Sequence, residues 1–174
     1  MNVKRRLLPL VLALIAICSA GSPAVAERPD KDGPVAGRVA GGPIPGAPRH
    51  DLREGVAAGQ WSVQGVYLPF NFSFSFTRSL NSRVFWPSTS GRACVNLRGT
   101  GSAEPTWWGR EIKVEMWNAY GTDTKVGATV RYSVDGSYYG YCWTGLYPYH
   151  EHYFRVVKDW STTRAVWGDG WVSP

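Results

Sequence analysis

The sequence predicts an all-β domain, an antiparallel β-sandwich of about eight or nine short strands held by one disulfide, with a closed barrel as the alternative. Apolar and polar residues alternate with period two in several segments, and turn residues recur between them. Helical spacing is not sustained anywhere after the N-terminal region. Residues 61–174 are enough for one domain with a single core, and we expect the sandwich to occupy this range.

The N-terminus has the pattern of a secretory signal. Three basic residues at positions 4–6 precede an apolar run over residues 7–17, and residues 24–26 form an A-x-A cleavage site. Residues 1–26 are therefore predicted to be a signal peptide, and the mature protein is expected to be secreted and extracellular. The apolar run is too short to span a bilayer, which needs ~20 residues, so no transmembrane span is expected in the mature chain.

Net charge gives little indication of a nucleic-acid partner. The whole sequence carries a formal charge of +6, and removal of residues 1–26 takes three of the 19 basic and none of the 13 acidic residues, which leaves +3. The remaining arginines are scattered among acids, whereas a nucleic-acid-binding protein usually clusters them on one face. We expect no nucleic-acid partner.

Residues 27–60 differ sharply in composition from residues 61–174. They contain five prolines, seven glycines and no aromatic residue, while every Trp, Tyr and Phe lies at or after Trp61. Such a segment is expected to bury too little apolar surface to offset its ordering entropy. It is predicted to be a disordered Pro/Gly-rich lead, either a linker or a cleaved pro-region.

Three segments alternate most clearly and are predicted to be strands with one solvated face: residues 70–77, 111–116 and 128–134. In the first, FNFSFSFT, the four phenylalanines are expected to face the core beneath an opposing sheet at ~10 Å. The alternative is a pore hairpin inserted in a membrane, because such hairpins alternate in the same way. Weaker strand candidates are residues 61–68, 83–86, 92–98, 137–144, 152–158 and 162–168. Asp135 and Gly136 form the strongest hairpin signal.

Two cysteines remain after signal cleavage, Cys94 and Cys142, and an even count in an exported protein predicts a disulfide. If the strands form a simple up-and-down meander, both cysteines lie at the same end of the sandwich. However, Cys94 falls on the polar face of its strand, because Val95 and Leu97 belong to the apolar face. A bulge or an outward-lying bridge would resolve this conflict.

No catalytic or metal-binding motif emerges. His150 and His152 lack a third and fourth ligand at suitable spacing, so no metal or other cofactor is expected. Glu111 and Glu115 share a solvated strand face, where neither has a reason to hold a raised pKa. Serines occur in neither a G-x-S-x-G elbow nor an S-x-x-K arrangement. We therefore expect a protein that is not an enzyme.

Aromatic residues outside the strand pattern are the candidate ligand-binding residues. The segment GTGSAEPTWWG, residues 99–109, is predicted to be a loop that ends in Trp107 and Trp108. In the meander, the turn after residue 134 lies at the same end and places Tyr138 and Tyr139 beside these tryptophans. A second aromatic cluster is YPYHEHY, residues 147–153. The alternative is that these rings cap the open ends of the sandwich.

The layout as a whole resembles small secreted proteins of actinobacteria. The likeness rests on the signal, the Pro/Gly-rich lead, the two cysteines, and the segments YFRV (153–156) and GDGWV (168–172). The resemblance implies export and compact β structure, and it brings no assigned activity. We expect a secreted binding module for cell-envelope or extracellular polysaccharide. The alternatives are a secreted toxin or membrane-active protein, and a small secreted hydrolase.

Overall fold

The structure is a computed structural model that describes residues 33–58 and 65–174. The predicted signal peptide, residues 27–32 and residues 59–64 lie outside the described residues. No helix in the described ranges is long and apolar enough to cross a membrane. The strands are β1 (Gly37–Arg38), β2 (Arg49–Arg53), β3 (Val66–Tyr67), β4 (Phe70–Phe76), β5 (Ser79–Asn81), β6 (Phe85–Trp86), β7 (Ala93–Ser102), β8 (Arg110–Asn118), β9 (Thr124–Val134), β10 (Tyr139–Trp143), β11 (His152–Val157) and β12 (Val166–Ser173).

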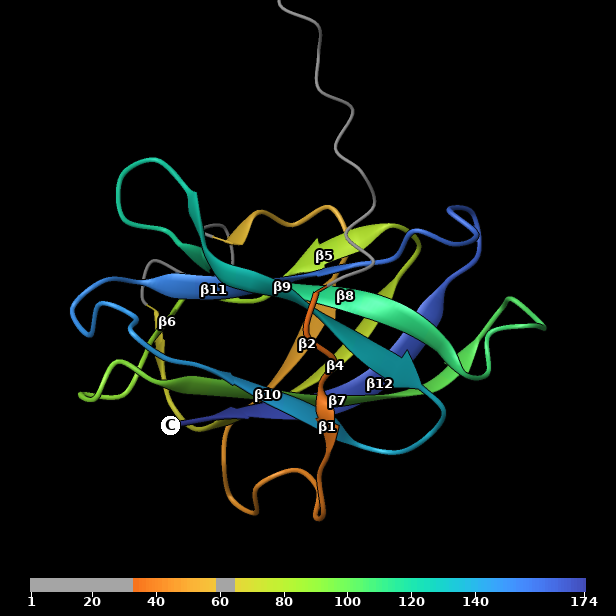
Figure 1. Ribbon diagram of the computed structural model, residues 1–174, viewed down its shortest axis with the longest axis horizontal. Coiled ribbons are helices and arrows are strands. Elements are labelled where there is room, and N and C mark those ends of the chain that lie inside the picture. Colours follow the sequence, from red (N-terminus) through yellow and green to blue (C-terminus); the bar gives the residue numbers. More distant parts are fainter. Residues whose placement is uncertain (1–32, 59–64) are drawn as a thin grey trace, which may run out of the picture.

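These strands form two sheets that pack as a sandwich (Figure 1). The first sheet has the order β1-β10-β7-β12-β4-β2, and the second has the order β3-β6-β11-β8-β9, with β5 also paired to β11. The all-β sandwich is thus confirmed, and the described strands do not close into a barrel. Two details of the prediction were wrong. Twelve strands form within residues 33–58 and 65–174, and the sheets are mixed, because β2 pairs with β4 and β3 with β6 in parallel.

The apolar face of β4 lies in the core, as predicted. All four of its phenylalanines are buried, with 3% or less of each residue exposed. Their rings contact the second sheet: Phe72 lies 5.1 Å from Phe154 and Phe70 lies 5.9 Å from Phe85, between ring centroids. Burial of rings of this size contributes a large share of the apolar stabilisation of a small sandwich.

The Asp135–Gly136 turn does not form the predicted hairpin. It connects β9, in the second sheet, to β10, in the first, so the chain crosses between layers there. The backbone amide of Gly136 donates to the carbonyl of Gly99 on β7. That contact attaches the turn to the first sheet, and β10 then pairs with β7 rather than with β9. The meander was therefore wrong, although the turn itself was correctly placed.

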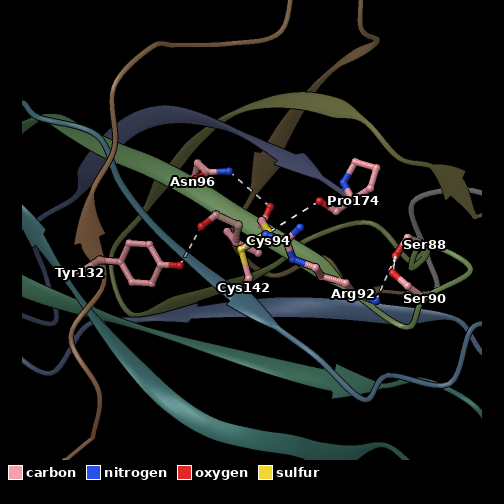
Figure 2. Close-up of a disulfide and its surroundings, with 9 residues drawn as sticks. Ser88, Ser90, Arg92, Cys94, Asn96, Tyr132, Cys142 and Pro174 are labelled. Carbon is pink, nitrogen blue, oxygen red and sulfur yellow. Dashed lines mark hydrogen bonds between the residues drawn. A yellow bond between two sulfur atoms is a disulfide. The ribbon is translucent and has the colours of Figure 1, made fainter.

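The predicted disulfide is present and lies on the outer side of the first sheet (Figure 2). Cys94 and Cys142 face each other directly in the β7–β10 register, with Cα atoms 3.9 Å apart. Val95 and Leu97 point into the core and are fully buried. The bridge is thus the outward-lying one that the polar position of Cys94 required. Arg92 covers it, with Nη2 3.2 Å from Sγ of Cys142.

The N-terminal segment, residues 33–58, is part of the sandwich. Its two strands form the two opposite edges of the first sheet, β1 beside β10 and β2 beside β4 (Figure 1). The connection between them crosses the outer face, where the side chain of Asn71 on β4 bonds both N–H and C=O of Ile44 and the carbonyl of Ala47. The prediction of a disordered lead therefore does not describe residues 33–58.

This segment also closes both open sides of the sandwich. Before β1, the amide of Ala36 donates to the carbonyl of Arg131 on β9, so the chain bridges the second sheet and the first. After β2, Glu54 accepts hydrogen bonds from the turn between β4 and β5, and Ala58 is buried against the second sheet. Leu52 of β2 is 2% exposed. Edge pairing of the backbone needs no aromatic side chain, which is why composition gave no sign of this order.

Candidate functional site

The predicted site begins at the β7–β8 loop, residues 103–109. Trp107 is half-buried and packs against the core, whereas Trp108 is 66% exposed. Their rings meet edge to face with centroids 5.3 Å apart. Trp108 lies next to the Asp135–Gly136 turn, since a Cβ at Gly136 would come within 3.4 Å of the indole. The loop and the turn therefore share one end of the sandwich, as expected.

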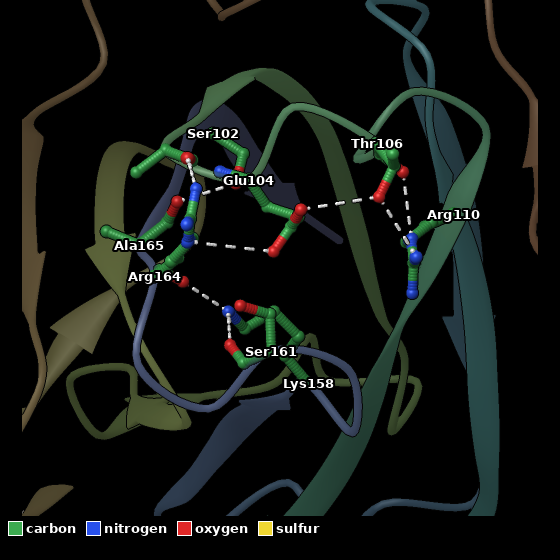
Figure 3. Close-up of polar contacts among 9 residues, drawn as sticks. Ser102, Glu104, Thr106, Arg110, Lys158, Ser161, Arg164 and Ala165 are labelled. Atoms are coloured by element: carbon green, nitrogen blue, oxygen red, sulfur yellow. Dashed lines mark hydrogen bonds and ion pairs between the residues drawn. The ribbon is translucent and has the colours of Figure 1, made fainter.

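Polar contacts hold this loop to the β11–β12 connection (Figure 3). Glu104 lies between Thr106 and Arg164, and Arg164 donates to the carbonyl of Ala103 at 3.1 Å. The buried ammonium of Lys158 donates to the carbonyls of Ser161 and Arg164, which fixes the facing loop. The tryptophan loop is therefore held in a defined position, and the polar groups that hold it bond to other residues of the protein.

The two predicted tyrosines lie in different places. The hydroxyl of Tyr139 donates to Asp135 at 2.8 Å. Tyr138 lies on the outer face of the first sheet, where its hydroxyl donates to Asp169 at 2.7 Å and its ring meets Trp171 edge to face at 5.0 Å. Burial, together with the bond to Asp169, raises the pKa of Tyr138 to about 12. Neither tyrosine makes a ring contact with either loop tryptophan in the described ranges, but Tyr139 bonds to the same turn that Trp108 lies next to.

A richer aromatic surface lies at the edge where β3 pairs with β6. Tyr67 and Trp86 are register partners on these strands, and their rings stack with centroids 5.0 Å apart and planes 29° apart. Tyr149, from the β10–β11 connection, is 93% exposed, and Tyr67 is 77% exposed. Together they line a hollow of about 430 Å³, which we call the aromatic groove; its other lining residues are Leu68, Pro87, Ser88, Thr89, Pro148 and Pro174.

Next to Tyr149 stands a stack of three rings. His150 lies between Tyr120, at 4.3 Å and nearly parallel, and Tyr147, at 5.0 Å. The amide of Asn118 fixes the imidazole: its Oδ1 accepts from the amide of Tyr120, so its Nδ2 donates to Nδ1 of His150 at 3.1 Å. His150 then carries its proton on Nε2. Tyr120 and Tyr147 are 69% and 65% exposed, so the stack extends the aromatic surface beyond the groove.

The other residues that the sequence suggested for catalysis or metal binding make contacts within the fold. His152 is buried at the start of β11, with Nδ1 2.9 Å from the carbonyl of His150. Glu111 forms an ion pair with Arg131 at 3.1 Å, and Glu115 accepts from the indole of Trp117 at 3.1 Å. Within the described residues, no group of three or more histidine, cysteine, aspartate or glutamate residues is arranged to hold a metal ion.

Another hollow, of about 480 Å³, lies over the outer face of the second sheet. Its aromatic floor is formed by Trp117 and Tyr153, whose rings are parallel within 9°. Tyr153 is only 6% exposed and its hydroxyl donates to Asp123 at 2.9 Å. Burial and that hydrogen bond raise the pKa of Tyr153 well above its usual range. These rings are covered by the protein itself and offer less free aromatic surface than the groove.

The groove presents flat apolar faces with a few hydroxyls. Its described lining contains no carboxylate, imidazole, amine or thiol side chain. The arrangement can therefore hold a ligand by stacking and hydrogen bonding. Residues 61–68 and 83–86 were predicted as strands, but the sequence did not mark Tyr67 and Trp86 as a site, because only the pairing of β3 with β6 brings their rings together. Comparisons of this chain with known protein families, with curated proteins and with solved structures found no match.

Proposed function

We propose that this protein is an extracellular binding module that holds a polysaccharide of the cell envelope or surroundings in the aromatic groove. The observation that carries the proposal is the stacked pair of Tyr67 and Trp86, with Tyr149 exposed beside it around one hollow. Soluble proteins usually bury aromatic rings, so a group of exposed rings around a hollow favours a binding site.

Sugars match this surface chemically. The C–H faces of a pyranose ring are apolar and stack on aromatic side chains, while its hydroxyls require hydrogen-bonding partners. The groove offers rings for the first requirement and the hydroxyls of Thr89 and Tyr149 for the second. The prolines at positions 87 and 148 stiffen the walls, so that little conformational entropy is lost when a ligand binds.

Export and absence of catalysis are parts of the same proposal. The predicted signal peptide supports an extracellular location. Binding without catalysis is supported by the lining of the groove and by the ion pair and hydrogen bonds that occupy Glu111 and Glu115. Dye release from anionic liposomes tests the membrane-active alternative, for which leakage at micromolar protein is required.

The test is a pull-down of the exported protein on insoluble polysaccharides and isolated cell walls. Tyr149→Ala and Trp86→Ala are expected to weaken retention by about 1 kcal/mol or more each, the order of a stacked ring. Trp108→Ala is the control, because it removes another exposed aromatic ring at the opposite end. Loss of retention with Trp108→Ala alone would instead favour the site predicted at Trp107 and Trp108. Absence of retention on any glycan would remove the proposal.

A further inference from the structure

The outer face of the first sheet carries a second set of side chains that could bind a ligand. In the strand register, Trp167 on β12 lies opposite Ser75 on β4, and Ser75 lies beside Arg53 on β2. All three side chains point away from the core, because their neighbours Val166, Phe74 and Leu52 are buried. The polar face of FNFSFSF therefore forms the middle of a row with an indole at one end and a guanidinium at the other.

Trp167 is placed as a flat platform. A Cβ at Gly101 would come within 2.5 Å of the indole Nε1 and 2.6 Å of Cε2, so the ring occupies the space where a larger side chain would stand. The indole consequently lies against the backbone of β7. The residue remains 42% exposed. One face of the ring is thus available to a ligand from solvent.

Asp169 and Asp51 on this face each accept a hydrogen bond, whereas two donors make none within the described residues. Asp169 accepts from Arg98 at 2.7 Å and from Tyr138, and Asp51 accepts from Ser73. In the described part of the chain, neither the guanidinium of Arg53 nor the indole N–H of Trp167 makes a hydrogen bond or an ion pair. Hydrogen-bond donors without a partner, next to an exposed aromatic ring, favour a ligand that carries acceptors, above all an anionic one.

The surface beside Arg53 is hollowed. A depression of about 240 Å³ runs between β2 and β4, and its lining includes Asp51, Arg53, Ser73 and Ser75. Trp167 and Arg53 lie two strand spacings apart, roughly 10 Å. Sugars a few residues apart in one chain can cover that span, one on the indole and another at the guanidinium. The small serines between them leave the path open.

We propose that this face is a second glycan site, specific for acidic polysaccharide such as a uronic acid polymer. A sugar ring stacks on Trp167, and the carboxylate of a sugar further along the same chain binds the guanidinium of Arg53. Ser75 and the second carboxylate oxygen of Asp51 are left for ring hydroxyls. The inference rests on the proposed function only in that both concern glycans, since it uses no residue of the aromatic groove.

The experiment is calorimetric titration of the exported protein with oligogalacturonate of defined length, and with a neutral oligosaccharide of equal length. Trp167→Ala is expected to weaken oligogalacturonate binding about tenfold and Arg53→Gln about fivefold. Added salt should weaken wild-type binding more than binding by Arg53→Gln, because the ion pair is screened. Trp108→Ala and Lys125→Gln are controls that remove an exposed indole and a positive charge elsewhere, and they should bind normally.

Three results would overturn the inference: no binding of oligogalacturonate, equal binding of the neutral oligosaccharide, or normal binding by both site variants. Arg53→Gln guards against misfolding as the cause, since its side chain makes no contact that folding needs, and circular dichroism should be unchanged. If Tyr149→Ala abolishes glycan binding while Trp167→Ala does not, the groove proposal stands and this one fails. The reverse pattern contradicts the proposal for the aromatic groove and supports the site on the outer face of the first sheet.

Discussion

Two regions of the sandwich are held by different physical means. Residues 65–174 contain every aromatic residue except Trp61, and they build the core from buried rings on β4, β6 and β11. Residues 33–58 contain none, yet they form both edges of the first sheet and close both sides of the sandwich. The comparison shows that backbone pairing and a few charged hydrogen bonds can order a segment whose composition suggests disorder.

Removing the N-terminal region should have the largest effect. A chain that begins at residue 61 would lose β1 and β2, expose the edges of β10 and β4, and uncover the polar groups of Asn71. We expect a loss comparable to the whole folding free energy of a small domain, about 5–15 kcal/mol, so that it does not fold. Near-ultraviolet circular dichroism of this chain, with a chain from residue 33 as control, is the measurement. An unchanged melting temperature would show that the segment is dispensable after all.

Substitutions on the two faces of β4 should differ in their effect on the free energy of unfolding. Phe72→Ala leaves a cavity beside Phe154 and is expected to lower the free energy of unfolding by about 3–5 kcal/mol. Ser73→Ala, on the outer face, should cost less than about 1 kcal/mol, because it removes one exposed hydrogen bond to Asp51. Urea unfolding of both variants measures the contrast. Equal losses would mean that the core does not dominate as described.

The disulfide ties β7 to β10, the strand on which β1 depends. Cys94→Ser should lower the free energy of unfolding by about 2–5 kcal/mol, as for other small disulfide-bonded domains. Because β1 pairs only with β10 in the described sheet order, protease should then cut near residues 37–38 more readily than in the wild type. Finding two free thiols in the unreduced, unfolded wild type would contradict the bridge itself.

The smallest effect concerns the carboxylate of Glu54, which follows β2 and bonds to the turn between β4 and β5. Partial burial opposes its ionisation, but hydrogen bonds from the side chain and amide of Thr77 and from the amides of Arg78 and Ser79 outweigh this and lower the pKa of Glu54 from 4.5 to about 2. Since the folded pKa is depressed, this stabilisation is complete above pH 4.5 and is lost as pH falls toward 2. Glu54→Gln should cost about 1–2 kcal/mol at neutral pH, because solvent screens the exposed group.

Comparing wild type with Glu54→Gln between pH 2 and 7 isolates this contribution, as the two unfolding curves should converge at the acidic end. Gln keeps the size and one acceptor of Glu, so the variant reports on charge rather than packing. A constant difference across the whole range would show that ionisation of Glu54 does not stabilise the turn between β4 and β5.

Local sequence patterns predicted part of this structure. Period-two alternation predicted β4, β8 and β9, because a strand with one buried face must alternate. The cysteine count predicted the bridge, and the polar position of Cys94 indicated that it lies outside the core. The exposed aromatic Tyr149 fell within a cluster that sequence had marked, since an aromatic stretch outside any strand pattern has no core to enter.

Only the tertiary structure decided the rest. The order of β1 and β2 depends on edges that distant strands supply, so no local pattern could reveal it. Tyr138 was separated from Trp107 and Trp108 because the turn after β9 leads into the other sheet. Tyr67 meets Trp86, and Ser75 comes to lie between Trp167 and Arg53, through pairing between strands far apart in sequence. Side chains on separate strands become neighbours only when register is fixed, and packing of the whole sandwich fixes it.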